Sequence, residues 1–212
     1  MDVLLKGIAV GVAIAAPVGP IGLLCIRTTL MQGRVAGLAT GLGAASADAL
    51  YGLMVAAGLT LTGILVAYAL PLKLFGGLLI AVLGGLTVRS FFRGGGETDP
   101  EASRSLSSGG SVFKAYGVTF VLTLSNPMTI IAFVGMVSAL GSTATADGEG
   151  AYLLVAGVFF GSALWWLFMV HLSLFARKRL PVERLRFVEL FSGLILLVWG
   201  GWIAGEAFFE LF

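Results

Sequence analysis

Six long apolar runs are the feature of this 212-residue sequence that most constrains its fold. A helix needs about 20 predominantly apolar residues to cross the hydrocarbon core of a bilayer. The runs lie at residues 5–26, 36–59, 72–92, 115–140, 151–175 and 187–209. The sequence therefore predicts an all-α polytopic membrane protein with six transmembrane helices.

The composition supports this fold class. The chain is 58% hydrophobic and 11% charged, whereas soluble domains carry about 25% charged residues. Residues 1–212 are expected to form one transmembrane domain. The single cysteine, Cys25, cannot form an internal disulfide and is expected to be a small apolar core residue.

The first apolar run partly resembles a secretory signal peptide, because Lys6 precedes an apolar stretch. However, Ala16-Pro17 is a poor cleavage context, and the apolar run continues to Ile26. We therefore expect a membrane helix here rather than a removed segment.

The most polar stretch, residues 94–111, is rich in glycine and serine and is expected to be a flexible cytoplasmic linker. It divides the chain into two halves of three helices, at about 1–93 and about 112–212. With an odd number of helices per half, repeated halves would be inverted relative to each other. Inverted repeats with interrupted helices are typical of secondary transporters, whose sites lie near the bilayer midplane.

Positive charge predicts the orientation, because cytoplasmic loops carry an excess of lysine and arginine. With the N-terminus outside, eleven of the thirteen basic residues fall on the inner side, and only Lys6 and Lys73 fall on the outer side. We predict both termini outside the cytoplasm. The basic run 177–186 could touch anionic lipid, although a topology signal is the plainer interpretation. A nucleic-acid partner is not implied.

Prolines interrupt the first and fourth segments near their middle. A proline inside a helix removes a backbone donor and clashes with the preceding turn. The first segment contains Ala16-Pro17-Val18-Gly19-Pro20, and the fourth contains Ser125-Asn126-Pro127. Such a kink is often only a shape device, but two kinks in matching positions favour a binding site. The candidate substrate contacts here are Pro17, Gly19, Pro20, Ser125, Asn126 and Pro127.

Asp48 lies near the middle of an otherwise uncharged stretch, residues 36–59. A carboxylate at bilayer depth costs at least ~2.5 kcal/mol and usually marks a transport or proton pathway. Asp48 lies about as deep as both proline interruptions, at 1.5 Å rise per residue. A structural ion pair is the alternative, but Arg27 and Arg34 are expected at the membrane edge. Asp48 is the candidate for substrate binding and for carrying a coupling proton.

Other residues are less specific. Trp165 and Trp166 lie deeper than an interfacial belt, so they could line a substrate cavity or pack in the core; Trp165 joins the candidate site. His171 is expected at the interface. Four glycine pairs with three-residue spacing predict close helix contacts, and such a pair on an outer face could make a homodimer. These pairs are Gly7/Gly11, Gly37/Gly41, Gly157/Gly161 and Gly201/Gly205.

The sequence lacks motifs for metal binding, phosphate binding and nucleophilic catalysis. One histidine, one cysteine and scattered acids do not make a metal cluster. There is no Gly-Lys-Ser/Thr phosphate loop and no Ser/His/Asp arrangement. The sequence therefore predicts neither an enzyme nor a cofactor or metal site.

A family resemblance follows from motifs spread over nearly the whole chain. The first half has Ala16-Pro17-Val18-Gly19-Pro20, then Arg27, Gly33-Arg34-x-x-Gly37-Leu38, Gly41-x-Gly43 and Asp48. The second half has Leu124-Ser125-Asn126-Pro127, followed by Met128, where a lysine or another polar residue is common. The chain resembles the lysine exporter (LysE) family of translocators. The resemblance implies an inner-membrane exporter of amino acids or similar small metabolites, driven by an ion gradient.

The predicted function is export of a small amino acid or related zwitterion across a bacterial inner membrane, coupled to protons. The helix ends at the two breaks would bind the substrate's carboxylate and ammonium. Two alternatives stay open: an exporter of a metal or inorganic ion, and, less favoured, an intramembrane enzyme acting on a lipid. The expected partners are the small-molecule substrate and membrane lipid, with a homodimer as an option.

Overall fold

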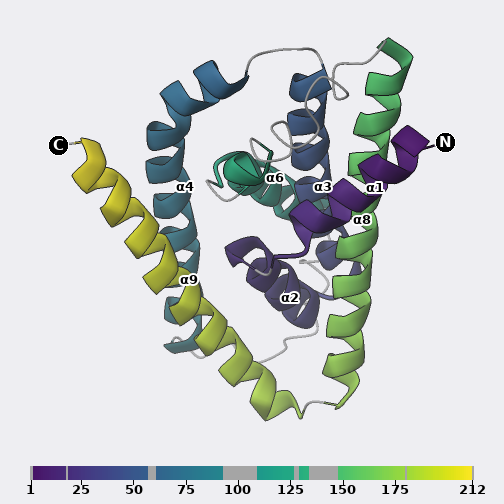
Figure 1. Cartoon of the computed structure of the whole chain (residues 1–212). Coiled ribbons are helices and arrows are strands. Elements are labelled where there is room, and N and C mark those ends of the chain that lie inside the picture. The colour runs from purple at the N-terminus through teal and green to yellow at the C-terminus, as the bar shows by residue number, and fades with distance from the viewer. Residues whose placement is uncertain are drawn as a thin grey trace.

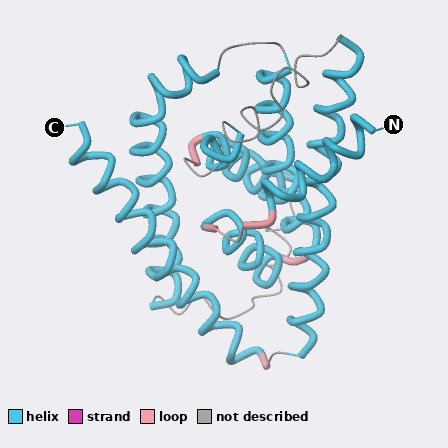
Figure 2. Tube along the Cα trace, in the orientation of Figure 1, coloured by secondary structure: helices cyan, strands magenta, loops and turns pink. Residues whose placement is uncertain are grey.

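The computed structural model describes residues 2–17, 19–56, 61–92, 109–126, 129–133, 148–179 and 181–211, in which all regular structure is helical (Figures 1 and 2). The helices are α1 Asp2–Ala15, α2 Pro20–Gln32, α3 Arg34–Ala56, α4 Leu61–Phe92, α6 Gly109–Leu124, α8 Gly148–Arg179 and α9 Val182–Leu211. Residues 129–133 form a further helical segment. The all-α prediction is confirmed for these ranges.

Three helical stretches in the described residues are long and apolar enough to cross a membrane: Leu70–Phe92, Gly150–Arg179 and Leu190–Glu210. The pair α1 and α2, bent by 84°, makes a fourth if it is taken as one span. The fourth predicted segment is interrupted after Leu124, and residues 134–140 of it lie outside the described ranges. The membrane class is supported, while the count of six spans stays a prediction.

Two predicted boundaries differ from the structure. The sequence predicts a third segment at residues 72–92, but α4 begins at Leu61 and continues through Pro71. The residues before Pro71 are apolar, so they extend the helix instead of linking two helices. The predicted linker 94–111 is also shorter, because α6 begins at Gly109. Residues 94–108 lie outside the described ranges.

The two chain ends lie toward the same end of the bundle in Figure 1, and the turn between α8 and α9 lies at the opposite end. The last turn of α8 carries the basic residues Arg177, Lys178 and Arg179 at that opposite end. This arrangement is compatible with both termini on one side. Which side of the membrane they face stays a prediction.

Glycines hold α1 against α8. A Cβ at Gly7 would lie 2.6 Å from the carbonyl oxygen of Leu154, and one at Gly11 would meet Val158 and Ser162. Helix backbones approach this closely in membranes only where residues are small. The close contacts predicted for the pairs Gly7/Gly11 and Gly157/Gly161 are therefore confirmed, with each pair packing against the other helix.

The other two glycine pairs differ in outcome. Gly37 packs against Thr29 and Gly41 against Trp166, as predicted. A Cβ added at Gly201 or Gly205 would have no heavy atom of the described residues within 4 Å, so the prediction that they make a close contact within the chain is wrong for these ranges. The glycine spacing alone does not reveal which helix face turns inward. Dimerisation through this face of α9 stays a prediction.

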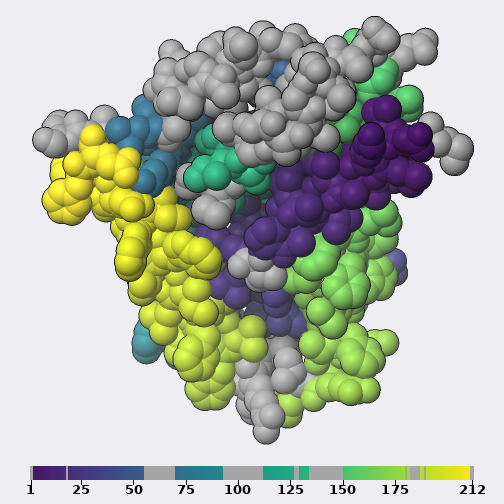
Figure 3. All heavy atoms as spheres, in the orientation of Figure 1, coloured from purple at the N-terminus to yellow at the C-terminus, as the bar shows by residue number. Residues whose placement is uncertain are grey.

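Large apolar side chains cover the outer face of α9, which spans much of the face seen in Figure 3. Trp202 is 71% exposed and Phe209 is 84% exposed. Other exposed residues of this helix are Phe187, Phe191, Val198, Trp199 and Phe208. In a membrane protein such a surface contacts lipid, because hydrocarbon takes the place of a protein partner.

Candidate functional site

Asp48 is buried in the middle of α3, with 3% of its surface exposed. Its carboxylate accepts a hydrogen bond from the hydroxyl of Ser162 in α8, at 2.7 Å between Oγ and Oδ2. Asp48 belongs to the first half of the chain and Ser162 to the second. Asp48 therefore contacts a helix of the other half of the chain.

Trp166 extends this hydrogen-bond chain by one turn of α8. Its indole Nε1 donates to Ser162 Oγ over 3.2 Å. The Ser162 hydroxyl thus accepts from the indole and donates to Asp48, which fixes the direction of its single proton. Trp166 is 6% exposed, so the three side chains form a buried polar chain.

The first break separates α1 from α2. Pro20 stands in the first turn of α2, where a proline's missing N–H is tolerated. Gly19 is the N-cap in an extended conformation, with φ −110° and ψ −161°, and as a glycine it supplies no side-chain cap. The N-terminus of α2 therefore keeps backbone donors and the positive end of the helix dipole at the break.

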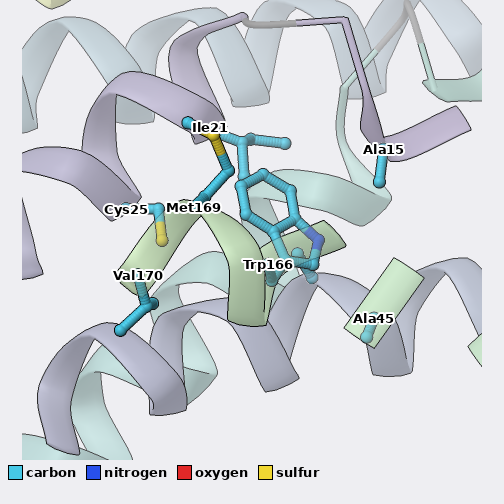
Figure 4. Close-up of a cluster of buried hydrophobic side chains, with 8 residues drawn as sticks. Ala15, Ile21, Cys25, Ala45, Trp166, Met169 and Val170 are labelled. Carbon is cyan, nitrogen blue, oxygen red and sulfur yellow. The ribbon is translucent and has the colours of Figure 1, made fainter. Parts of the chain in front are cut away.

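Apolar packing links the first break to Asp48. Ala15 and Ile21, on either side of the break, lie in one buried cluster with Trp166 (Figure 4). The other buried members are Cys25, Ala44, Ala45, Met169 and Val170. Since Trp166 also donates to Ser162, one side chain joins the first break to the hydrogen-bond chain that ends on Asp48. Cys25 is a buried core residue, as predicted.

The second break follows α6. The helix ends at Leu124, Ser125 forms a turn, and the backbone is helical again from residue 129. The N–H of Asn126 donates to the Thr123 carbonyl over 3.2 Å, and the N–H of Ile130 donates to the Asn126 carbonyl over 3.2 Å. Interruption of this segment is therefore confirmed. Pro127 lies outside the described residues.

Two further features surround the second break. A Cβ at Gly76 of α4 would lie 2.7 Å from the Ser125 carbonyl oxygen, so α4 packs directly against the turn. The buried hydroxyl of Thr123 finds no hydrogen-bond partner among the described residues. Leaving a buried polar group unpaired costs about 1–3 kcal/mol, so Thr123 adds a buried, unpaired polar atom beside the break.

Tyr51 connects the second break to α3, three residues after Asp48. Its hydroxyl donates to the Leu124 carbonyl over 2.6 Å, at the last residue of α6. Its ring stacks on Phe133, with 5.1 Å between centroids and 28° between planes. Helical positions three apart share a face. The same face of α3 therefore carries the buried acid and a contact to the second break.

The predicted site residues differ in how deeply they are buried. Asp48, Pro20 and Ser125 are buried, whereas Gly19 and Asn126 are half-buried and Pro17 is exposed. Trp165 is half-buried and packs 5.6 Å from the ring of Phe168, while Trp166 makes the polar contact near Asp48. What these residues do in transport stays a prediction.

Sequence reasoning missed Ser162 and Tyr51. Asp48 and Ser162 lie at equal offsets in their helices, since α3 begins at Arg34 and α8 at Gly148. These offsets count from the helix starts in the structure, so the sequence alone did not single out Ser162. From the sequence, Tyr51 could be recognised only as an aromatic residue with a hydroxyl group, about one helical turn after Asp48.

His171 and the possible metal ligands bear on the two alternative functions. His171 is exposed, with Nδ1 2.8 Å from the Leu167 carbonyl one turn earlier. Within the described ranges, no three side chains of histidine, cysteine, aspartate or glutamate come together as metal ligands. No observation in these ranges favours the metal-export alternative.

Comparison with known proteins agrees with the motifs. The chain matches the LysE type translocator family over residues 12–205. A protein of Bacillus subtilis (strain 168) described as "Putative amino acid efflux protein YcgF" is 30% identical over 204 residues, which cover 94% of each chain. No solved structure matches the chain significantly. With its apolar helices, the protein is a multi-pass membrane transporter that takes a small-molecule substrate, and it belongs to the LysE type translocator family.

Proposed function

We propose that the protein is a secondary transporter that exports an amino acid or a related small zwitterion across the bacterial inner membrane, in exchange for protons. The observation that carries the proposal is the Asp48 carboxylate, buried in a membrane helix and bonded to Ser162 of the other half. The described function of the Bacillus subtilis relative, amino acid efflux, supports the choice of substrate class.

An inverted repeat gives this site its setting. If α1 corresponds to α6, α3 to α8 and α4 to α9, then the packing of α1 on α8 corresponds to that of α6 on α3. Under the same correspondence, exchanging the two halves maps the pair α3–α8 onto itself, and likewise the pair α4–α9. The pairs α1–α8, α3–α6, α3–α8 and α4–α9 all pack extensively. The equal offsets of Asp48 and Ser162 support the same correspondence. Transporters of this build bind substrate between the repeats.

The roles of the site residues follow from charge. The substrate's ammonium would bind Asp48, and its carboxylate would bind at the uncapped N-terminus of α2, beside Pro17, Gly19 and Pro20. At the second break, Ser125, Asn126 and Pro127 would supply further polar contacts. A buried carboxylate is stable only when it is paired or protonated. Asp48 would therefore bind either the substrate's ammonium or a proton, but not both at once. Because the two bind in turn, export of the substrate would be coupled to entry of a proton.

Counterflow in liposomes tests the proposal. Purified protein is reconstituted into vesicles loaded with one unlabelled amino acid, and uptake of the labelled form is followed for each common amino acid. We expect uptake of at least one, with net efflux accelerated when the side opposite the substrate is made acidic. Asp48→Asn should lose both activities. Wild-type rates and unchanged pH dependence in Asp48→Asn would refute the role of this residue, and no uptake by the wild type would refute export.

A further inference from the structure

Tyr51 contacts both sides of the second break from the first half of the chain. Its hydroxyl donates to Leu124, the last residue before the break, and its ring stacks on Phe133, beyond the break. Both aromatic side chains are 1% exposed. Ile130 and Val158 complete the same buried cluster. The side chain that contacts the second break thus lies 73 residues before Leu124 in the sequence.

The hydroxyl of Tyr51 satisfies an acceptor that α6 cannot satisfy itself. The last four carbonyls of a helix have no partner within it and carry the negative end of its dipole. The oxygen–oxygen distance of 2.6 Å lies within the ordinary range for an O–H···O hydrogen bond. Tyr51 therefore occupies the negative pole at the second break.

We propose that Tyr51 is a positioning residue of the export cycle, which keeps the second break in register with Asp48. Because the two residues share a face of α3, a shift of this helix on substrate release would move the Leu124 carbonyl and Phe133 as well. The inference rests on the proposed function. It assigns Tyr51 no contact with the substrate, so its loss should affect the rate of cycling more than binding.

Tyr51→Phe tests the hydroxyl, because the variant keeps the ring against Phe133 and removes only the donor. We expect the maximal counterflow rate to fall about tenfold, since one buried carbonyl loses its partner, with half-saturation changed less than threefold. Tyr116→Phe is the matched control, because this half-buried tyrosine of α6 stacks on Phe120 and lies away from the break. It should keep the wild-type rate.

Amide hydrogen exchange of the full-length protein separates positioning from general stability. The probe is an equimolar mixture of the common L-amino acids. In the wild type, the mixture should change exchange at Asn126 and Ile130, whose N–H groups make hydrogen bonds on the two sides of the second break. In Tyr51→Phe these amides should exchange about tenfold faster without responding to the mixture, while residues 15–23 at the first break stay unchanged.

The outcomes are distinguishable. Equal acceleration at both breaks would indicate a loss of general stability and overturn the positioning role. Wild-type exchange and wild-type counterflow in Tyr51→Phe would overturn it as well. If Tyr51→Phe does not fold, Phe133→Leu removes the stacking from the other side and should give the same local acceleration. Absence of counterflow in the wild type itself would overturn the proposed function, and with it the role of Tyr51 in export.

Discussion

The two helix breaks are held in different ways. At the first break, the N-cap Gly19 supplies no side-chain cap to α2, and the flanking residues Ala15 and Ile21 pack in the apolar cluster of Trp166. At the second, the last carbonyl of α6 is already bonded to Tyr51. The positive pole at the first break therefore lacks a side-chain cap from its N-cap residue, whereas the negative pole at the second break is bonded to Tyr51. In the proposed export cycle, the first break would bind the substrate's carboxylate, and Tyr51 would hold the second break in position.

Asp48 is connected to both breaks, so its removal should have the largest effect. Asp48→Asn keeps the shape of the side chain but removes its negative charge, which in our proposal binds the substrate's ammonium. Hydrogen bonds to charged groups contribute about 1.5–3 kcal/mol, so export should fall by about 100-fold. Efflux from loaded vesicles measures this, with Glu206→Gln as a control, because Glu206 is an exposed partner of Lys73. A loss below threefold would leave Asp48 a structural residue.

Gly76→Ala should damage the second break. The added Cβ would lie 2.7 Å from the Ser125 carbonyl oxygen, which belongs to the backbone and cannot swing away. Overpacking of this kind costs about 1–3 kcal/mol. We expect a lower midpoint in thermal unfolding in detergent and export reduced about tenfold. Gly85→Ala in the same helix is the control, since its nearest neighbour is a flexible side-chain end at 3.7 Å. Equal midpoints for both variants would contradict tight packing at the second break.

Trp166→Phe should weaken the link between Asp48 and the first break. The variant keeps an aromatic ring beside Ala15 and Ile21 but removes the donor to Ser162. One hydrogen bond contributes about 1 kcal/mol, so export should fall about fivefold. Trp165→Phe, which stands outside the polar chain, should stay near the wild-type rate. The reverse order of the two variants in an efflux assay would assign the site to Trp165 instead.

The parts of this architecture that could be predicted are those governed by local rules. The breaks at Pro17–Pro20 and before Pro127 follow from the missing donor and the steric clash of proline. Close helix contacts at the pairs Gly7/Gly11 and Gly157/Gly161 follow from the glycine spacing, but the same spacing at Gly201 and Gly205 lies on the outer surface. Which of the adjacent residues Trp165 and Trp166 faces the polar chain depends on the rotation of α8 about its axis. Packing against the other helices sets that rotation.

Contacts between the halves could not be predicted in the same way. The bond from Tyr51 to Leu124 joins residues 73 positions apart, and the bond from Ser162 to Asp48 joins residues 114 apart. No periodicity within one helix encodes such a pairing. The acid itself was predictable because its charge is costly in a membrane, whereas its neutral partners carry no comparable signal.

Gly19→Ala should have the smallest effect, although it alters the first break itself. A Cβ at this position meets no atom of the described residues within 4 Å, and the extended backbone with φ −110° suits any residue. We expect an unchanged unfolding midpoint and export within about twofold of the wild type, because the backbone donors of α2 stay in place. Gly19→Asp would sharpen the comparison. Its carboxylate would cap α2 and occupy the positive pole, so half-saturation for the substrate should rise while the unfolding midpoint stays the same or increases. An unchanged half-saturation would mean that the positive pole at the first break does not bind the carboxylate, and the difference between the two breaks would then be one of packing alone.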